Sequence, residues 1–184
     1  AARGGVVTRT GADSLVALSL LDALQPIGLS RIVLDWAAVW PQLSVLATVA
    51  PVAALQVLDR DAFRPLGTVI APLGTPRGDQ VALRITMTRD TGVVSESEVP
   101  AGTVARIPLR TGETATIVVQ PSRHFDLGLG RPGVGGRATV QGGGLGLIID
   151  TRGRPLRHPA DLDERRGRMI RWLRNLEGDG HASP

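Results

Sequence analysis

The sequence predicts an α/β segment, followed by an all-β domain and a terminal helix. Three observations carry this prediction. Residues 1–62 contain apolar runs spaced for helices and one buried strand, residues 63–157 contain short alternations of polar and apolar residues between glycines and prolines, and helical spacing returns over residues 158–184. These ranges are the expected domain boundaries, and 184 residues suffice for one sizeable core, or for a small domain with part of another.

The first helix is expected to begin with Asp13 or Ser14 as its cap and to end near Pro26 and Gly28. Its apolar residues surround it almost completely, which is typical of a buried helix. These residues are Leu15, Val16, Leu18, Leu20, Leu21 and Leu24.

A short apolar run, residues 31–35, predicts a buried strand after this helix. A second apolar helix is expected to start at Pro41 and to run toward Leu58, with a break at Pro51. Because an isolated strand cannot satisfy its own backbone groups, its partners are expected from earlier residues of a longer protein or from another chain.

The middle segment predicts a β-sandwich or a small barrel. Residues 80–88 alternate so that their apolar side chains lie on one face, and short runs of the same kind recur at residues 104–109, 115–119, 137–140 and 145–149. The glycines at 142–144 precede the last run, and we expect them to allow a close approach of the backbone.

The terminal segment predicts one helix, in which Asp161 and Glu164 form a capping pattern and Gly178 ends the helix. Its apolar side is expected to contain Leu162, Met169, Trp172, Leu173 and Leu176. Its other side contains Arg165, Arg166, Arg168, Arg171 and Arg174. We expect this side to be a solvated face with ion pairs such as Glu164 with Arg168. The alternative is a surface that binds an acidic partner.

The composition argues against several functional classes. The chain has no cysteine and no signal-peptide pattern, so cytoplasmic localisation is expected. No apolar run is long and unbroken enough for a membrane span. The pI of 11.2 reflects a net charge of only +4 in a chain whose basic residues are all arginine. With dispersed charges and 3% aromatic residues, nucleic-acid binding is not expected.

Motifs that carry chemistry are weak. Residues 128–133 match the dinucleotide fingerprint as a string, but the glycines and proline that follow predict a loop where the motif needs a helix. Ser122 and His124 are too close in sequence to form a catalytic pair on a strand, and the histidines lack metal-site spacing. Residues 150–155 predict a turn that exposes Arg152 and Arg154, with a weak indication of an anionic contact.

Taken in order along the chain, several segments resemble a known family, the ATPases associated with glutamate mutase, which belong to the actin, sugar-kinase and heat-shock-chaperone (ASKHA) class. Residues 66–74 are similar to the join that follows the ATPase lobe in that family. The other similar segments are residues 4–7, 20–28, 31–35, 121–128 and 144–156.

The resemblance implies that residues 1–62 are the end of an ATPase lobe, with Gly4 and Gly5 beneath the adenine or ribose of ATP. It implies a nucleotide-dependent chaperone or reactivase that assists cobalamin-dependent mutases. ATP would be shared with a missing lobe, which would also hold Mg²⁺ outside this chain, so the chain alone is not expected to be an enzyme. The partners would be that lobe, in the same protein or a separate chain, and a mutase. The alternative is a non-catalytic β module that docks a protein partner.

Overall fold

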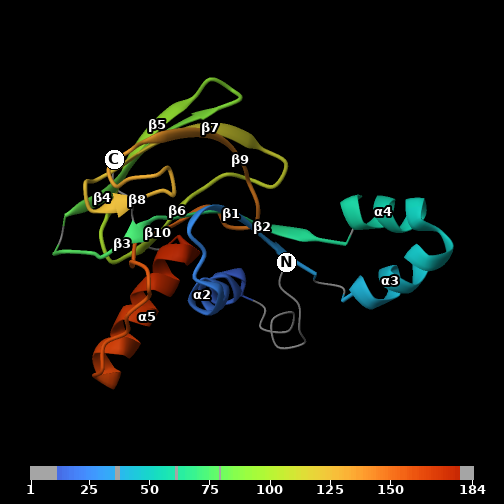
Figure 1. The fold of residues 1–184 in the computed structure, drawn as a ribbon, viewed down its shortest axis with the longest axis horizontal. Helices are drawn as coiled ribbons and strands as arrows, with labels where there is room; N and C mark the ends of the chain where they lie inside the picture. Colours follow the sequence, from blue (N-terminus) through green and yellow to red (C-terminus); the bar gives the residue numbers. More distant parts are fainter. Residues whose placement is uncertain (1–11, 36–37, 61, 79, 179–184) are drawn as a thin grey trace.

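A four-stranded mixed sheet forms the middle layer of the molecule (Figure 1). The computed structural model describes residues 12–35, 38–60, 62–78 and 80–178. In spatial order, the strands of this sheet are β1 (Gly28–Leu34), β2 (Arg64–Ala71), β10 (Gly146–Asp150) and β6 (Val104–Ile107). β10 runs parallel to β2, and the two outer strands are antiparallel to their neighbours.

A second four-stranded sheet, antiparallel throughout, covers one face of the middle sheet, and two helices cover the other (Figure 1). Its strands, in spatial order, are β5 (Val94–Pro100), β4 (Val81–Arg89), β7 (Thr114–Pro121) and β9 (Gly136–Gln141). The short strands β3 (Leu73–Gly74) and β8 (Phe125–Asp126) pair with each other. The helices are α2 (Asp13–Leu24) and α5 (Leu162–Glu177). The chain is therefore a mixed α/β protein with several sheets and a helix near its carboxy terminus, as the sequence predicts at this level.

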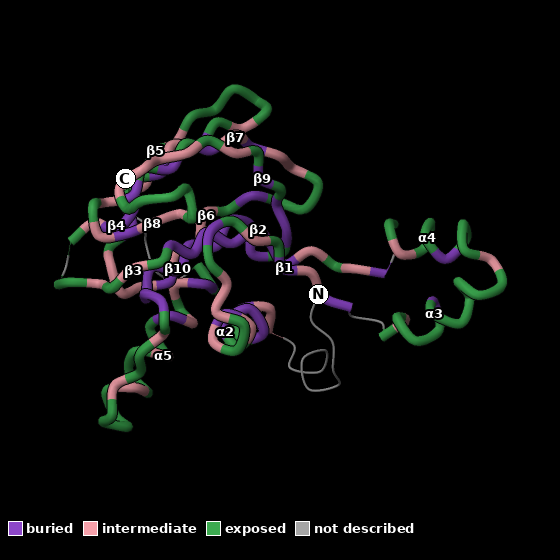
Figure 2. Tube along the Cα trace, in the orientation of Figure 1, coloured by how far each residue is buried: buried purple, intermediate pink, exposed green. Residues whose placement is uncertain are grey.

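Alternating side chains of β10 contribute to two hydrophobic cores, one on each face of the middle sheet. Ile148 belongs to the core shared with Leu18 of α2 and Trp172 of α5. Leu147 and Ile149 belong to the core between the two sheets. Figure 2 shows the resulting buried band through the middle of the molecule. A strand that is buried on both faces explains why this run is continuously apolar rather than alternating.

β1 pairs with a strand of the same chain. Antiparallel pairing sets Gly28 opposite Ala71 and Leu34 opposite Arg64, so one sheet crosses the expected boundary between residues 62 and 63. The prediction that partners come from outside the chain is therefore wrong for this edge of β1. In the described ranges, its other edge pairs with no strand. Most of the expected join, residues 66–71, is the buried part of β2.

α2 differs from its prediction in its cap and in its exposure. Ala12 is the cap residue, and no side chain caps the helix. Asp13 instead pairs with Arg64, with an oxygen–nitrogen distance of 2.6 Å, and the Ser14 hydroxyl donates to Glu177 at 3.1 Å. Only one side of the helix is buried, and its last leucine is 68% exposed. The run of leucines made the helix look buried all round, although only α5 and the middle sheet cover it.

Other elements agree with the sequence. Asp161 caps α5 by accepting the Glu164 amide at 2.7 Å, and Gly178 ends it with φ of 95°. Leu162 is the exception on its apolar side, since it is 73% exposed. The five predicted β runs lie on β4, β6, β7, β9 and β10, whereas β2 and the polar edge strand β5 were not predicted.

The segment between β1 and β2 is a helical hairpin that protrudes from the layered body (Figure 1). It contains α3 (Trp40–Val49) and α4 (Pro51–Arg60), separated at the predicted break, and we call it the apolar arm. Buried Asp35 precedes the arm, and its carboxylate accepts the amide of Val39, the N-cap residue of α3, at 3.0 Å. At the base of the arm, the rings of Trp40 and Phe63 lie 5.8 Å apart.

Glycines let the backbone pack closely around the start of β10. A Cβ on Gly143 would lie 2.6 Å from the carbonyl carbon of Leu66, as expected for this glycine run. Gly146 has φ of 75°, and a Cβ there would lie 2.5 Å from the amide nitrogen of Leu109. Glycine is therefore required at position 146 both for its conformation and for its space.

We expect Gly146→Ala to lower the free energy of unfolding by about 3 kcal/mol or more, because an unfavourable φ and a backbone clash add together. Gly112→Ala is the matched control, since Gly112 has φ of 86° with nothing within 4 Å of its Cβ position, and it should cost only about 1 kcal/mol. Urea unfolding measures both. Equal losses would show that the close approach at Gly146 is unimportant.

Candidate functional site

Two arginines converge on one buried carboxylate at the end of β10. Arg152 donates to both oxygens of Asp150 at 2.9 Å, and Arg154 donates to one of them at 2.8 Å. All three side chains are almost completely buried. The prediction that this turn exposes its arginines is therefore wrong, because Asp150 lies at the buried end of a central strand and draws both guanidinium groups inward.

Arg152 also connects the middle sheet to both helices. It donates to Asp22 of α2 at 2.7 Å, and its guanidinium lies 4.7 Å from the ring centroid of Trp172 on α5. The three nitrogens of Arg152 thus all have acceptors, while its flat face rests on an aromatic ring. The two remaining nitrogens of Arg154 donate hydrogen bonds to the backbone carbonyl oxygens of Pro26 and Gly153. Every nitrogen of the two buried guanidinium groups therefore donates a hydrogen bond within the protein, which indicates a structural role.

The charges of this cluster shift the pKa values of its members. Burial alone would raise the pKa of Asp150, but hydrogen bonds and attraction from Arg152 and Arg154 outweigh it and hold the pKa below its ordinary value. Burial would likewise lower the pKa of Arg152, yet Asp150 and Asp22 raise it above the usual range. Asp150 and Arg152 are consequently held in their charged forms at neutral pH.

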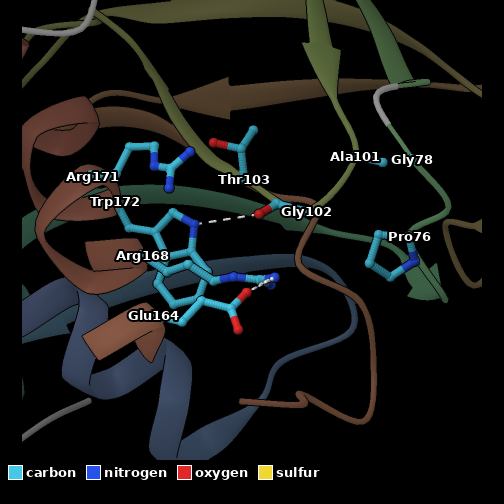
Figure 3. A pocket seen from close by; sticks show the side chains of 9 residues that line it. All are labelled: Pro76, Gly78, Ala101, Gly102, Thr103, Glu164, Arg168, Arg171 and Trp172. Carbon is cyan, nitrogen blue, oxygen red and sulfur yellow. Dashed lines mark hydrogen bonds and ion pairs between the residues drawn. The ribbon is translucent and has the colours of Figure 1, made fainter. Parts of the chain in front are cut away.

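A pocket of about 500 Å³ opens beside this cluster, between α5 and two loops (Figure 3). Its loop wall consists of Pro76, Gly78 and residues 101–103. Its helix wall consists of Glu164, Arg168, Arg171 and Trp172, which recur at helical spacing along one side of α5. A smaller pocket of about 190 Å³ shares part of this lining and adds Arg157. The volume lies within the range of small-molecule sites.

The inner wall of the pocket is fixed by hydrogen bonds. The indole N–H of Trp172 donates to the carbonyl of Gly102 at 3.3 Å, drawn in Figure 3. The Gly102 amide donates to Thr151, and the Thr151 hydroxyl donates to the carbonyl of Pro100 at 2.6 Å. Asn175 of α5 donates to the carbonyl of Val104 at 3.0 Å. These hydrogen bonds therefore fix the position of α5 relative to the loop of residues 101–103.

The outer part of the pocket is positively charged. Arg168 extends over the opening toward Pro76 and pairs with Glu164 at 2.7 Å, as predicted from the sequence (Figure 3). Arg171 and Arg157 are exposed, and within the described ranges neither forms an ion pair. Such an arrangement favours anions over neutral ligands.

Ser122 and His124, which were weighed as catalytic residues in the sequence, do not line this pocket. Gly4 and Gly5 lie outside the described residues, so their role in nucleotide binding stays a prediction. Residues 128–133 form a loop that ends before β9, as expected. Over the described ranges, no group of three or more acids and histidines is arranged to hold a metal ion. No helix in that part of the chain is both long and apolar enough to cross a membrane.

The pocket itself was missed at the sequence level, although its arginines were noted as one face of the helix. The signal was partial, because Arg168 and Arg171 recur on the side of α5 that carries Trp172. The loop wall, formed by Pro76, Gly78 and residues 101–103, is distant in sequence from the helix and has no pattern of its own. Comparison with protein-family models, curated proteins and solved structures finds no significant match to this chain.

We expect Asp150→Asn to lower the free energy of unfolding at pH 7 by about 3–5 kcal/mol, because it leaves two buried guanidinium groups against a neutral amide. Asp59→Asn, an exposed acid of α4, is the control and should stay within about 0.5 kcal/mol of the wild type.

The pH dependence gives a second test. The pKa of Asp150 is lower in the folded state than in the unfolded state. Its contribution to the free energy of unfolding is therefore present above the unfolded-state pKa of about 3.9 and is lost as the pH falls through the folded-state pKa. Urea unfolding between pH 7 and pH 2 should show this loss in the wild type and a smaller one in the asparagine variant. Parallel curves for both proteins would contradict the assignment.

Proposed function

We propose that this chain is the non-catalytic, carboxy-terminal portion of a nucleotide-dependent chaperone- or reactivase-like protein that acts with cobalamin-dependent mutases, and that its own task is to dock a protein partner. The resemblance to glutamate-mutase-associated ATPases supports the first part, because it extends over nearly the whole chain in order. ATP and Mg²⁺ would then be handled together with a lobe outside residues 1–184.

The apolar arm is the observation that carries the docking role. Residues 36–58 contain no charged side chain. Within the arm, only Leu43 and Ala54 are buried, whereas Val45, Val49, Val52 and Leu55 are each more than 60% exposed. A shallow hollow of about 320 Å³ runs between the two helices and is lined mainly by apolar side chains.

An arm of this kind is unfavourable in water unless something covers it. Each helix has ten residues, which is too short for stability from helix propensity alone. Contiguous exposed apolar surface of this extent marks protein interaction sites in soluble proteins. The partner that fits the resemblance is the remaining ATPase lobe, or a mutase subunit held by the assembled protein.

A stand-alone binding module is the second candidate, and a specific observation favours it. β1 is paired within the chain, and both hydrophobic cores are built from residues of this chain. A body closed in this way needs no other lobe to fold. The two candidates differ in whether nucleotide binding exists at all in the full protein.

ATP binding separates the two candidates. We expect a longer version that adds the reading frame upstream of Ala1 to bind Mg²⁺–ATP at least tenfold more tightly than the chain alone. Isothermal titration calorimetry measures both. Equal affinities, or no binding by the longer protein, would favour the stand-alone module.

Charges placed on the arm test the docking role. Val52→Glu combined with Leu55→Glu should leave the melting temperature of the chain alone nearly unchanged, because both side chains are exposed in it. In the longer protein, the same change should lower the melting temperature by several degrees if the arm packs on the ATPase lobe. If it packs on a mutase, the change should instead weaken mutase binding at least tenfold.

The matched control is Val93→Glu with Val94→Glu, which adds the same charges at two exposed valines in and before β5. This control should alter neither the stability of the longer protein nor its affinity for the mutase. If the arm variant behaves like the control in both assays, the arm is not the docking surface.

A further inference from the structure

The arginine-lined pocket beside α5 has a charge that its own residues leave uncompensated. The buried cluster is balanced, since Arg152 and Arg154 face Asp150 and Asp22. The outer lining adds three positive charges, from Arg157, Arg168 and Arg171, and one negative charge, from Glu164. The described lining of the two pockets therefore has an excess of two positive charges.

This excess points to a doubly charged anion. We propose that the pocket binds the phosphate group of a small molecule. A phosphate monoester carries close to two negative charges at pH 7 and offers three acceptor oxygens to the guanidinium groups. A single carboxylate would neutralise only half of the excess and offers two oxygens.

The geometry supports a ligand held at α5. Arg168 and Arg171 lie three residues apart and therefore project from the same side of the helix. In Figure 3 both side chains extend toward the opening between α5 and the loops, on either side of the Trp172 indole. Arg157 lines the adjoining pocket, which shares Arg168 with the larger one. A phosphate at this junction can contact guanidinium groups from two segments of the chain.

The buried arginines do not compete for the ligand. All three nitrogens of Arg152, and all three of Arg154, already donate to protein oxygens. Among the residues that the structure describes, Glu164 is the only acid lining either pocket, and it pairs with Arg168. A bound phosphate would replace this carboxylate as the acceptor for Arg168, so Glu164 weakens binding by competition and by repulsion.

The pocket also has room for more than the phosphate. Its volume of about 500 Å³ exceeds what one tetrahedral ion fills, and Pro76, Ala101 and Trp172 add apolar surface to the lining. The organic part of a phosphate monoester can rest there. This site lies on α5 and involves no residue of the apolar arm, so it stands or fails independently of the proposed docking function.

Titration calorimetry with inorganic phosphate on the full chain at low salt tests the proposal. We expect millimolar or tighter binding that weakens with added salt. Arg171→Gln should weaken it at least tenfold, since it removes one charge-assisted contact. Glu164→Gln should strengthen it several-fold. Arg166→Gln, which removes an equal charge from an exposed residue of α5 outside the pocket, is the control and should bind within twofold of the wild type.

Two further ligands define the chemistry. Adenosine monophosphate should bind more tightly than inorganic phosphate if an organic group rests on the apolar lining, and equally if the site selects free phosphate. Acetate should bind at least tenfold more weakly than either. The proposal is overturned if phosphate does not bind, if acetate binds as well, or if Arg171→Gln and Arg166→Gln weaken binding equally. Unchanged melting temperatures of the variants would establish that any loss is local.

Discussion

The ion cluster around Asp150 is the interaction on which the arrangement of layers depends. One buried carboxylate at the end of the central parallel strand binds two arginines, and one of these reaches α2 and the face of an α5 tryptophan. Hydrophobic burial alone would allow the helices to slide on the sheet, because it has no direction. Charged hydrogen bonds from the turn after β10 to α2, together with the contact between Arg152 and Trp172 of α5, fix their register. The same cluster brings the loop after β10 under α5, and the wall of the pocket is a consequence of that position.

Burying three charged side chains is costly unless each has a partner, and here one partner, Asp22, lies 130 residues from Arg152 in the sequence. This separation explains why the turn at residues 150–155 was misjudged from its sequence. Two arginines in a glycine-containing turn normally face solvent, and nothing near them in the sequence shows that Asp22 and a helix will cover them. The local signals were sufficient elsewhere: the cap at Asp161, the break at Pro51 and the alternation along β4 each depend on residues a few positions apart.

The remaining differences have the same physical origin. β2 begins with arginine and proline and contains a glycine, so its propensity is poor, yet it is central because β1 and β10 pair with it on either side. The pattern of leucines in α2 does not indicate which of these side chains are buried by the rest of the chain. The pocket combines a helical arginine pattern, visible in the sequence, with loop residues that have no pattern. Strand pairing and the burial of a helix face depend on residues that are distant in the sequence. A single sequence therefore predicts them poorly.

The insertion point of the helical hairpin has an evolutionary consequence. Leu34 and Arg64 lie opposite each other in the antiparallel pair, so the chain leaves the sheet and returns to it at neighbouring positions. A short turn would connect the same two residues without altering the register of any strand. The hairpin is thus an insertion at a position where changes in length or sequence leave the layered body unaltered. Diversification of binding preference within such a lineage is therefore expected to concentrate in this one interval.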